Sequence, residues 1–251
     1  MWWAYLGALF IGISLGLLGS GGSILTVPIL LYLVGEPEKL AIAESLGIVA
    51  TISLFGSIPY IRKKEVHWIS LLFFGVPGML GTFSGASISK YISGTTQLLI
   101  FAVVMLLAAT MMIRNPKSEV QAVPKSPSKW LLIGEGLAVG VLTGLVGVGG
   151  GFLIIPSLVL LTGLSMRLAV GTSLLIITLQ SSIGFLKYTS VLAEQNLHIN
   201  WDIMIVFALI GIAGSFVGNK VGTKISHKSL KKGFGFFLVL MGVYIFYRNA
   251  F

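Results

Sequence analysis

The chain has 251 residues, of which 55% are hydrophobic, 10% are charged and 32 are glycine. With a mean hydropathy of +0.97 and long uncharged stretches between short polar loops, this composition is typical of a multi-pass helical membrane protein and excludes a water-soluble enzyme. The sequence has no cysteine, which excludes disulfides, thiolate metal sites and a cysteine nucleophile, and its three histidines lack metal-ligand spacing. We therefore expect a membrane protein that needs no bound cofactor.

Ten apolar segments are predicted, and two of them are short. In chain order they cover about residues 2–18, 24–34, 40–60, 68–89, 95–113, 130–148, 152–162, 168–188, 202–219 and 233–248. The short segments, 24–34 and 152–162, would each rise about 16 Å as helices, half of a hydrocarbon core of about 30 Å. We expect each to be a half-helix that forms a hairpin with the segment before it. The first segment begins with two tryptophans and no basic residue, so we expect it to stay in the fold rather than to be a cleaved signal peptide.

The second half of the chain repeats the first at an offset of 128 residues. Residues 12–35 and 140–163 are identical at 11 of 24 positions, most of them glycine or proline. A polar stretch with three prolines, 114–129, separates the halves and is the only plausible linker. We predict that the whole chain is a single all-α membrane domain, built from a first repeat (1–113), this linker and a second repeat (130–251), with five segments in each repeat.

The basic residues give an orientation for these segments. The chain has 17 Lys and Arg against 8 Asp and Glu, a formal net charge of +9. If the loop with Arg62, Lys63 and Lys64 faces the cytoplasm, 13 Lys and Arg fall on the cytoplasmic side and 4 on the other, in agreement with the positive-inside rule. Both termini then lie outside the cytoplasm and the repeats have opposite orientations, a layout typical of secondary transporters. The charge excess is thus explained by orientation, and no nucleic acid is expected as a partner.

Each predicted half-helix opens at a cluster of glycines. Glycine allows positive φ and close approach of a ligand to the backbone, and a helix N-terminus directs unpaired N–H groups and the positive end of the dipole toward an anion. The clusters therefore predict an anion site without cationic side chains. Its candidate residues are Gly19, Ser20, Gly21, Gly22, Ser23, Gly147, Gly149, Gly150 and Gly151. The alternative, that glycine only permits close helix packing, is preferred for four Gly-x-x-x-Gly pairs, which begin at Gly12, Gly81, Gly140 and Gly214.

Polar residues in the third segment of each repeat are further candidates for binding the substrate. Hydroxyl and amide groups can hydrogen-bond the oxygens of an anion at little desolvation cost. The residues concerned are Ser45, Thr172, Ser173 and Gln180, the last followed by Ser181 and Ser182. Packing between helices explains the first three hydroxyl residues equally well, whereas the cost of burying an amide in lipid favours a ligand role for Gln180.

Glu44 stands within an apolar segment, at the position that Thr172 has in the second repeat. An intramembrane carboxylate is a candidate for proton relay, and we predict that Glu44 couples transport to a proton. The alternative is that its charge only stabilises the N-terminus of its own helix. Glu135 is the other carboxylate in an apolar segment. The sequence has no catalytic set and no phosphate-binding motif, so we expect neither an enzyme nor an ATPase.

The glycine clusters and the helix starts that follow them resemble those of the TauE/SafE family of sulfite exporters. The stretches that carry the resemblance run from Gly16 to Pro28, Ala41 to Leu46, Gly144 to Pro156 and Ala169 to Leu174. The resemblance implies a secondary carrier for small anions such as sulfite, thiosulfate, sulfoacetate, sulfolactate, taurine-related sulfonates and other organic acids. This chain departs from the family pattern in having Ser20 and Ser23 where glycine is favoured, and Glu44 where threonine is more usual.

We therefore expect a secondary active transporter of the cytoplasmic membrane that carries a small anion by alternating access, coupled to a proton. Its partners are the lipid bilayer, the anion and the proton, and the sequence is compatible with a homodimer. Two alternatives are open, a passive anion channel and a membrane scaffold or assembly protein that transports nothing. A carrier shows saturation and counterflow, a channel passes much faster flux, and a scaffold gains no stability from an anion.

Overall fold

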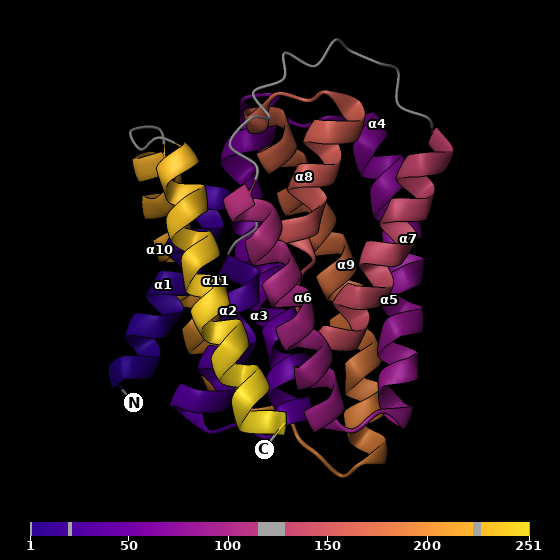
Figure 1. Cartoon of the computed structure of the whole chain (residues 1–251), viewed down its shortest axis with the longest axis vertical. Coiled ribbons are helices and arrows are strands. Elements are labelled where there is room, and N and C mark those ends of the chain that lie inside the picture. Colours follow the sequence, from indigo (N-terminus) through magenta and orange to yellow (C-terminus); the bar gives the residue numbers. More distant parts are fainter. Residues whose placement is uncertain (1, 20–21, 115–128, 223–226, 251) are drawn as a thin grey trace.

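A computed structural model describes residues 2–19, 22–114, 129–222 and 227–250. In these residues the chain forms helices and no strand, so the prediction of an all-α fold is confirmed. Figure 1 shows the helices side by side in a bundle, most of them along its long axis. Among the described residues, five helical stretches are long and apolar enough to cross a membrane: Glu38–Arg62, Trp68–Tyr91, Lys129–Val146, Met166–Glu194 and Trp201–Val221.

The ten predicted segments are all present as helices. The first half of the chain forms α1 (Trp2–Leu18), α2 (Gly22–Ile29), α3 (Glu38–Arg62), α4 (Trp68–Ser70), α5 (Val76–Ile88) and α6 (Gly94–Arg114). Short segments extend these helices: the π-helices η1 (Leu30–Val34), after α2, and η2 (Leu71–Gly75), between α4 and α5, and the 3-10 turn η3 (Ser89–Tyr91), after α5. The second half forms α7 (Lys129–Val146), α8 (Gly151–Thr162), α9 (Met166–Glu194), α10 (Trp201–Gly222) and α11 (His227–Ala250).

The two short helices of the prediction are α2 and α8. Helix α8 has 12 residues and ends at Gly163, whose φ of 65° is left-handed. Helix α2 has 8 residues, and the five-residue π-helix that continues it ends at Gly35, with φ of 89°. Glycine adopts this conformation without strain, which explains why both helices stop where they do.

Helix α9 is longer than predicted, since it ends at Glu194 rather than near residue 188. Lys187 interrupts the apolar sequence there, but its Nζ lies 5.2 Å from the centre of the Phe83 ring. Beyond it, Val191 and Leu192 are buried against the rest of the protein. Packing of the helix, which the sequence pattern of one segment does not contain, therefore adds about two turns.

Helices of one half pack against helices of the other. Helix α1 lies along α10, α5 along α7, α3 against α9, and α6 against α11. At the offset of 128, α1 corresponds to α7 and α3 corresponds to α9. Two related halves that pack against each other through equivalent helices would form pairs of this kind. In Figure 1, α1 begins at the lower end of the bundle and α7 at the upper end. The inverted repeat stays a prediction, and both observations agree with it.

Glycine allows the closest of these helix contacts. A Cβ atom on Gly12 of α1 would overlap the carbonyl oxygen of Gly211 in α10, and one on Gly140 of α7 would overlap that of Gly78 in α5. The remaining members of the four Gly-x-x-x-Gly pairs likewise face backbone of the partner helix: Gly16, Gly81, Gly85, Gly144, Gly214 and Gly218. The packing role predicted for these pairs is confirmed.

The substitution Gly140→Val is therefore expected to destabilise the protein strongly. The side chain would meet the backbone of α5, which cannot rotate away, and overpacking of this kind costs about 1–3 kcal/mol or more. Gly134→Val provides a matched control on the same helix, because a Cβ there meets nothing within 4 Å. Thermal unfolding of the purified variants in detergent checks this prediction, and equal midpoints for the two variants would contradict it.

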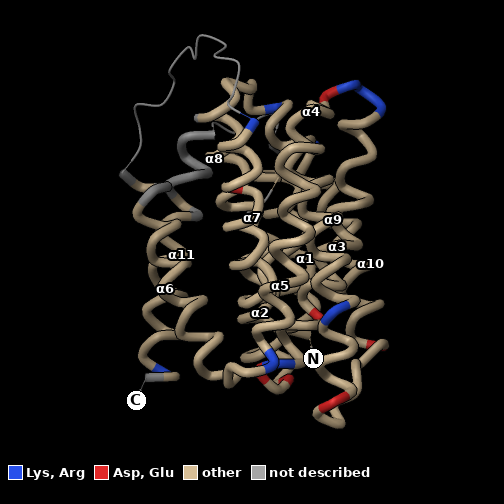
Figure 2. The backbone as a smooth tube through the Cα atoms, turned by 90° about the vertical axis from the view of Figure 1, so that its right-hand side faces the viewer, with Lys and Arg blue, Asp and Glu red and all other residues tan. Residues whose placement is uncertain are grey.

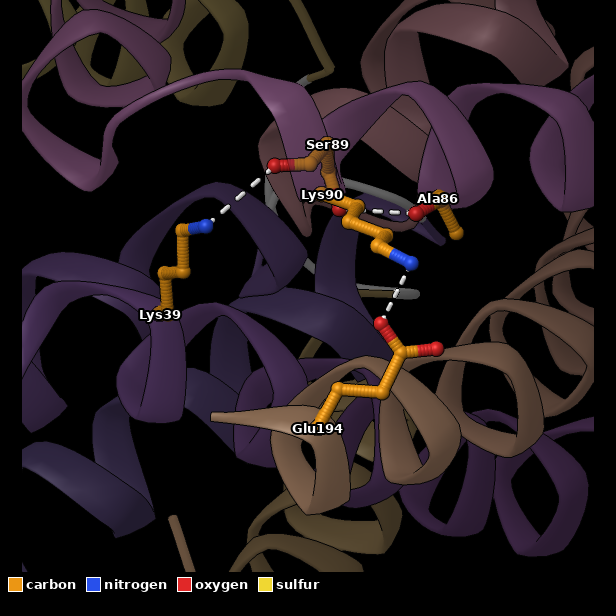
Figure 3. Close-up of polar contacts among 5 residues, drawn as sticks. All are labelled: Lys39, Ala86, Ser89, Lys90 and Glu194. Carbon is orange, nitrogen blue, oxygen red and sulfur yellow. Dashed lines mark hydrogen bonds and ion pairs between the residues drawn. The ribbon is translucent and has the colours of Figure 1, made fainter. Parts of the chain in front are cut away.

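Charged residues gather toward the two ends of the bundle, while its middle is nearly free of them (Figure 2). At one end, polar contacts join α3, η3 and α9, as Figure 3 shows: Lys39 Nζ donates to the carbonyl oxygen of Ser89 at 3.4 Å, and Lys90 Nζ lies 2.5 Å from Glu194 Oε2. The Lys90 and Glu194 side chains are 44% and 53% exposed, so solvent screens their attraction. Which end of the bundle faces the cytoplasm stays a prediction.

Candidate anion site at the start of helix α8

Helix α8 begins inside the protein at a left-handed glycine. Gly150 has φ of 62°, and its carbonyl oxygen accepts from the N–H groups of Leu153 at 2.9 Å and Ile154 at 3.1 Å. The amides of Gly151 and Phe152 precede these first helical bonds, and, as at any helix start, have no acceptor within the helix. All of these residues except Leu153 are buried. The positive end of the α8 dipole therefore lies within the bundle.

Three buried polar side chains surround this helix start. A Cβ atom on Gly150 would overlap Thr143 Oγ1 of α7 and would lie 3.6 Å from Gln180 Oε1 of α9, and one on Gly149 would lie 3.1 Å from Ser181 Oγ. The three side chains are at most 1% exposed. Neither their hydroxyl oxygens nor either polar atom of the amide has a hydrogen-bond partner among the described residues. We call these three side chains, with Gly149 and Gly150, the α8 polar site.

Burial without a partner makes the α8 polar site costly to maintain. Each buried polar group left without a hydrogen bond costs about 1–3 kcal/mol, and such groups are rare in native proteins. A small, mainly apolar pocket adjoins the site from the side of α6. Phe101 and Val104 of α6 line it together with Thr143 and Gly150. The buried hydroxyls and amide without a partner among the described residues fit a site that a small polar ligand completes.

Of the three polar side chains at the start of α8, the first half keeps only the counterpart of Ser181, Ser53, among the residues that the structure describes. At the offset of 128, Leu15 stands for Thr143 and Ile52 for Gln180, and both are fully buried. A Cβ atom on Gly22, the counterpart of Gly150, would overlap the carbonyl oxygen of Ile11. The predicted candidates Ser20 and Gly21 lie outside the described residues, and Ser23 is buried. The sequence predicts two equivalent clusters, whereas the described side chains make them chemically different.

Ser45 and Ser173 lie next to the glycine clusters, each beside the cluster of the other half. The hydroxyl of Ser45, on α3, is within donating reach of the carbonyl oxygen of Gly147 and of that of Ile42, at 2.8 Å. The hydroxyl of Ser173, on α9, lies 3.2 Å from the carbonyl oxygen of Gly19 and 2.9 Å from that of Val170. Both side chains thus lie beside the glycines, with their hydroxyls on carbonyl oxygens. A direct contact of either with substrate stays a prediction.

Glu44 and Thr172 occupy equivalent places at the starts of helices in the opposite half. Glu44 Oε1 accepts from the backbone N–H of Asn200, just before α10, at 2.8 Å. Thr172 Oγ1 accepts from the backbone N–H of His67, just before α4, at 2.9 Å. Glu44 is fully buried, and its Oε2 has no partner among the described residues. Asn200 also donates from Nδ2 to Glu36 Oε1 at 3.4 Å, so two carboxylates flank one helix start.

Sequence reasoning finds part of the α8 polar site. Gln180, Gly149 and Gly150 are among its candidates, and Ser181 follows Gln180 along the helix. Thr143 is missed, because a threonine in an apolar segment is an ordinary packing residue. Comparison of the two repeats would find it, since Thr143 stands at the position that Leu15 has in the first repeat.

Comparison with known proteins gives the family of the chain. A family profile described as "Sulfite exporter TauE/SafE" matches residues 4–245. The chain is 34% identical over 247 residues to a "Probable membrane transporter protein" of Xylella fastidiosa (strain Temecula1), covering 95% of this chain and 92% of that protein. It is 28% identical over 263 residues to the "Probable membrane transporter protein YunE" of Bacillus subtilis (strain 168), covering 94% and 93%. No solved structure matches it. The chain belongs to the TauE/SafE family and is a membrane transporter.

Proposed function

We propose that this transporter is a secondary carrier of small sulfur-containing or organic anions, such as sulfite, thiosulfate or sulfoacetate, and that it works by alternating access. The observation that carries the proposal is the α8 polar site, whose buried amide and hydroxyls have no partner among the residues that the structure describes. The N–H groups at the start of α8 and the two hydroxyls are hydrogen-bond donors, and rotation of the Gln180 amide, whose Oε1 faces Gly150 while Nε2 faces Gly78 of α5, would add a third kind of donor. Donors at the positive end of a helix dipole bind an anion without a cationic side chain.

Proton coupling through Glu44 is the second part of the proposal. Its Oε2 is buried without a partner in the part of the chain that the structure describes, and its other oxygen accepts the Asn200 N–H at the start of α10. Uptake of a proton by Glu44 changes the charge at a contact between the two halves. Alternating access requires the two halves to move relative to each other at such contacts. Binding of the anion and loading of the proton thus occur on different elements, α8 and α3.

Purified protein is expected to gain thermal stability from at least one of sulfite, thiosulfate, sulfoacetate and succinate. An anion at 100 times its Kd stabilises the folded state by about 2.7 kcal/mol. Liposomes loaded with the stabilising anion should then show saturable uptake of the labelled anion and counterflow. Flux without saturation or counterflow would favour the passive channel instead, and the absence of both stabilisation and flux would favour the scaffold.

A further inference from the structure

Two serines each lie within hydrogen-bond reach of the carbonyl oxygen of a glycine in the other half of the protein, Ser45 of α3 with Gly147 and Ser173 of α9 with Gly19. We call these two contacts the serine ties. The offset of 128 relates the serines to each other and the glycines to each other. Each serine is fully buried. Each therefore makes the same contact, in opposite directions across the interface of α3 and α9.

The glycines of these ties are the residues at which α1 and α7 end. Gly19 N–H donates to Leu15 at 2.8 Å, and Gly147 N–H donates to Thr143 at 2.9 Å, both to carbonyl oxygens one helical turn earlier. Their φ values are 68° and 74°. Left-handed glycine at this position ends a helix and turns the chain away from it. The direction in which the chain leaves, and hence the placement of the next helix start, depends on these two turns.

The opposite half fits closely against both turns. A Cβ atom on Gly19 would lie 2.5 Å from Val170 Cγ1, and one on Gly147 would lie 2.5 Å from Ile42 Cγ2. Val170 and Ile42 are also the residues whose carbonyl oxygens the two serines reach within their own helices. A hydroxyl has one proton to donate, so each serine bonds either the glycine or its own helix. When the serine hydroxyl leaves the glycine carbonyl, it can still donate to the carbonyl oxygen of its own helix. The tie is therefore easy to break and to form again.

We propose that Ser45 and Ser173 are positioning residues, each holding the glycine turn that precedes the half-helix of the other half. Ser45 holds the Gly147 turn and so places the start of α8, while Ser173 holds the Gly19 turn that leads into α2. The effect of Ser45 on anion binding rests on the proposed function, in which the substrate binds at the α8 polar site. Only the tie of Ser45 holds the start of α8, so Ser45 is the serine expected to affect the α8 polar site through its glycine turn.

Hydrogen exchange of the full-length protein without ligand tests the ties directly. Loss of one buried hydrogen bond, worth about 1 kcal/mol, should speed exchange about fivefold in the segment it holds. Ser45→Ala is expected to speed exchange in residues 147–154 and to leave 22–29 unchanged, and Ser173→Ala is expected to do the reverse. Ser57→Ala is the matched control, because this buried serine of α3 donates within its own helix, to Leu54 at 2.7 Å. It should change neither segment.

Thermal-shift titrations with sulfite and sulfoacetate on the same variants separate this inference from the proposed function. Ser45→Ala should weaken anion binding about fivefold, with Ser57→Ala close to wild type. Exchange that rises only within the helix carrying each substitution would overturn the positioning role, whether or not an anion binds. The crossed exchange pattern in a protein that neither anion stabilises would uphold the ties and count against the proposed anion site.

Discussion

Gln180→Leu is expected to stabilise the ligand-free protein while strongly weakening anion binding. The amide is fully buried and neither of its polar atoms has a partner among the described residues, so its removal relieves a penalty of about 1–3 kcal/mol. The lost hydrogen bond to a charged ligand is worth about 1.5–3 kcal/mol, which corresponds to a loss of roughly 10-fold to 150-fold in affinity. Unfolding midpoints with and without sulfite or sulfoacetate measure both effects on one sample.

The repeat supplies a matched control for this experiment. Ser181 belongs to the α8 polar site, and Ser53 is its counterpart at the offset of 128; both hydroxyls are buried without a partner among the described residues. Ser181→Ala should weaken anion binding, whereas Ser53→Ala should leave it unchanged. Equal weakening by both would indicate a site shared by the two halves. Undiminished binding in Gln180→Leu would remove the α8 polar site from the mechanism.

The helices of this fold are predictable because their signals are local. A run of apolar residues, a glycine that ends it and a polar linker are all read within one segment, and the predicted ends agree with the observed ones within six residues. The short helix α8 is predicted because left-handed glycines stand at both of its ends, Gly150 and Gly163. The π-helical segments η1 and η2 are not predicted, since nothing in their apolar sequences distinguishes them from α-helix.

The candidate site is less predictable because it depends on how the halves meet. Ser45 and Ser173 are predicted only as candidates for binding the substrate or for helix packing, and the crossing of α3 and α9 decides which glycine each hydroxyl reaches. The difference between the halves also escapes the sequence pattern, which emphasises the glycines they share. In the structure, Thr143 differs from a packing threonine because its buried hydroxyl has no partner among the described residues.

Glu44→Gln is expected to abolish transport driven by a pH gradient while preserving counterflow of the anion. Glutamine keeps an oxygen that can accept from the Asn200 N–H, as Glu44 Oε1 does at 2.8 Å, but it cannot take up a proton. In liposomes, a gradient of one pH unit supports up to about tenfold accumulation for each coupled proton. The variant should reach no accumulation, with exchange in the absence of a gradient within about twofold of wild type.

Two further variants separate the proton from the hydrogen bond at this position. Glu44→Thr introduces the residue that the second half carries at position 172, where the hydroxyl accepts the His67 N–H at 2.9 Å. It should behave as Glu44→Gln, since it keeps an acceptor for the start of α10 without a titratable group. Glu135→Gln is the control, because Glu135 also has a buried oxygen without a partner among the described residues. If gradient-driven accumulation survives in Glu44→Gln and Glu44→Thr, this carboxylate only joins α3 to α10; its loss in Glu135→Gln alone would assign the coupling proton to α7.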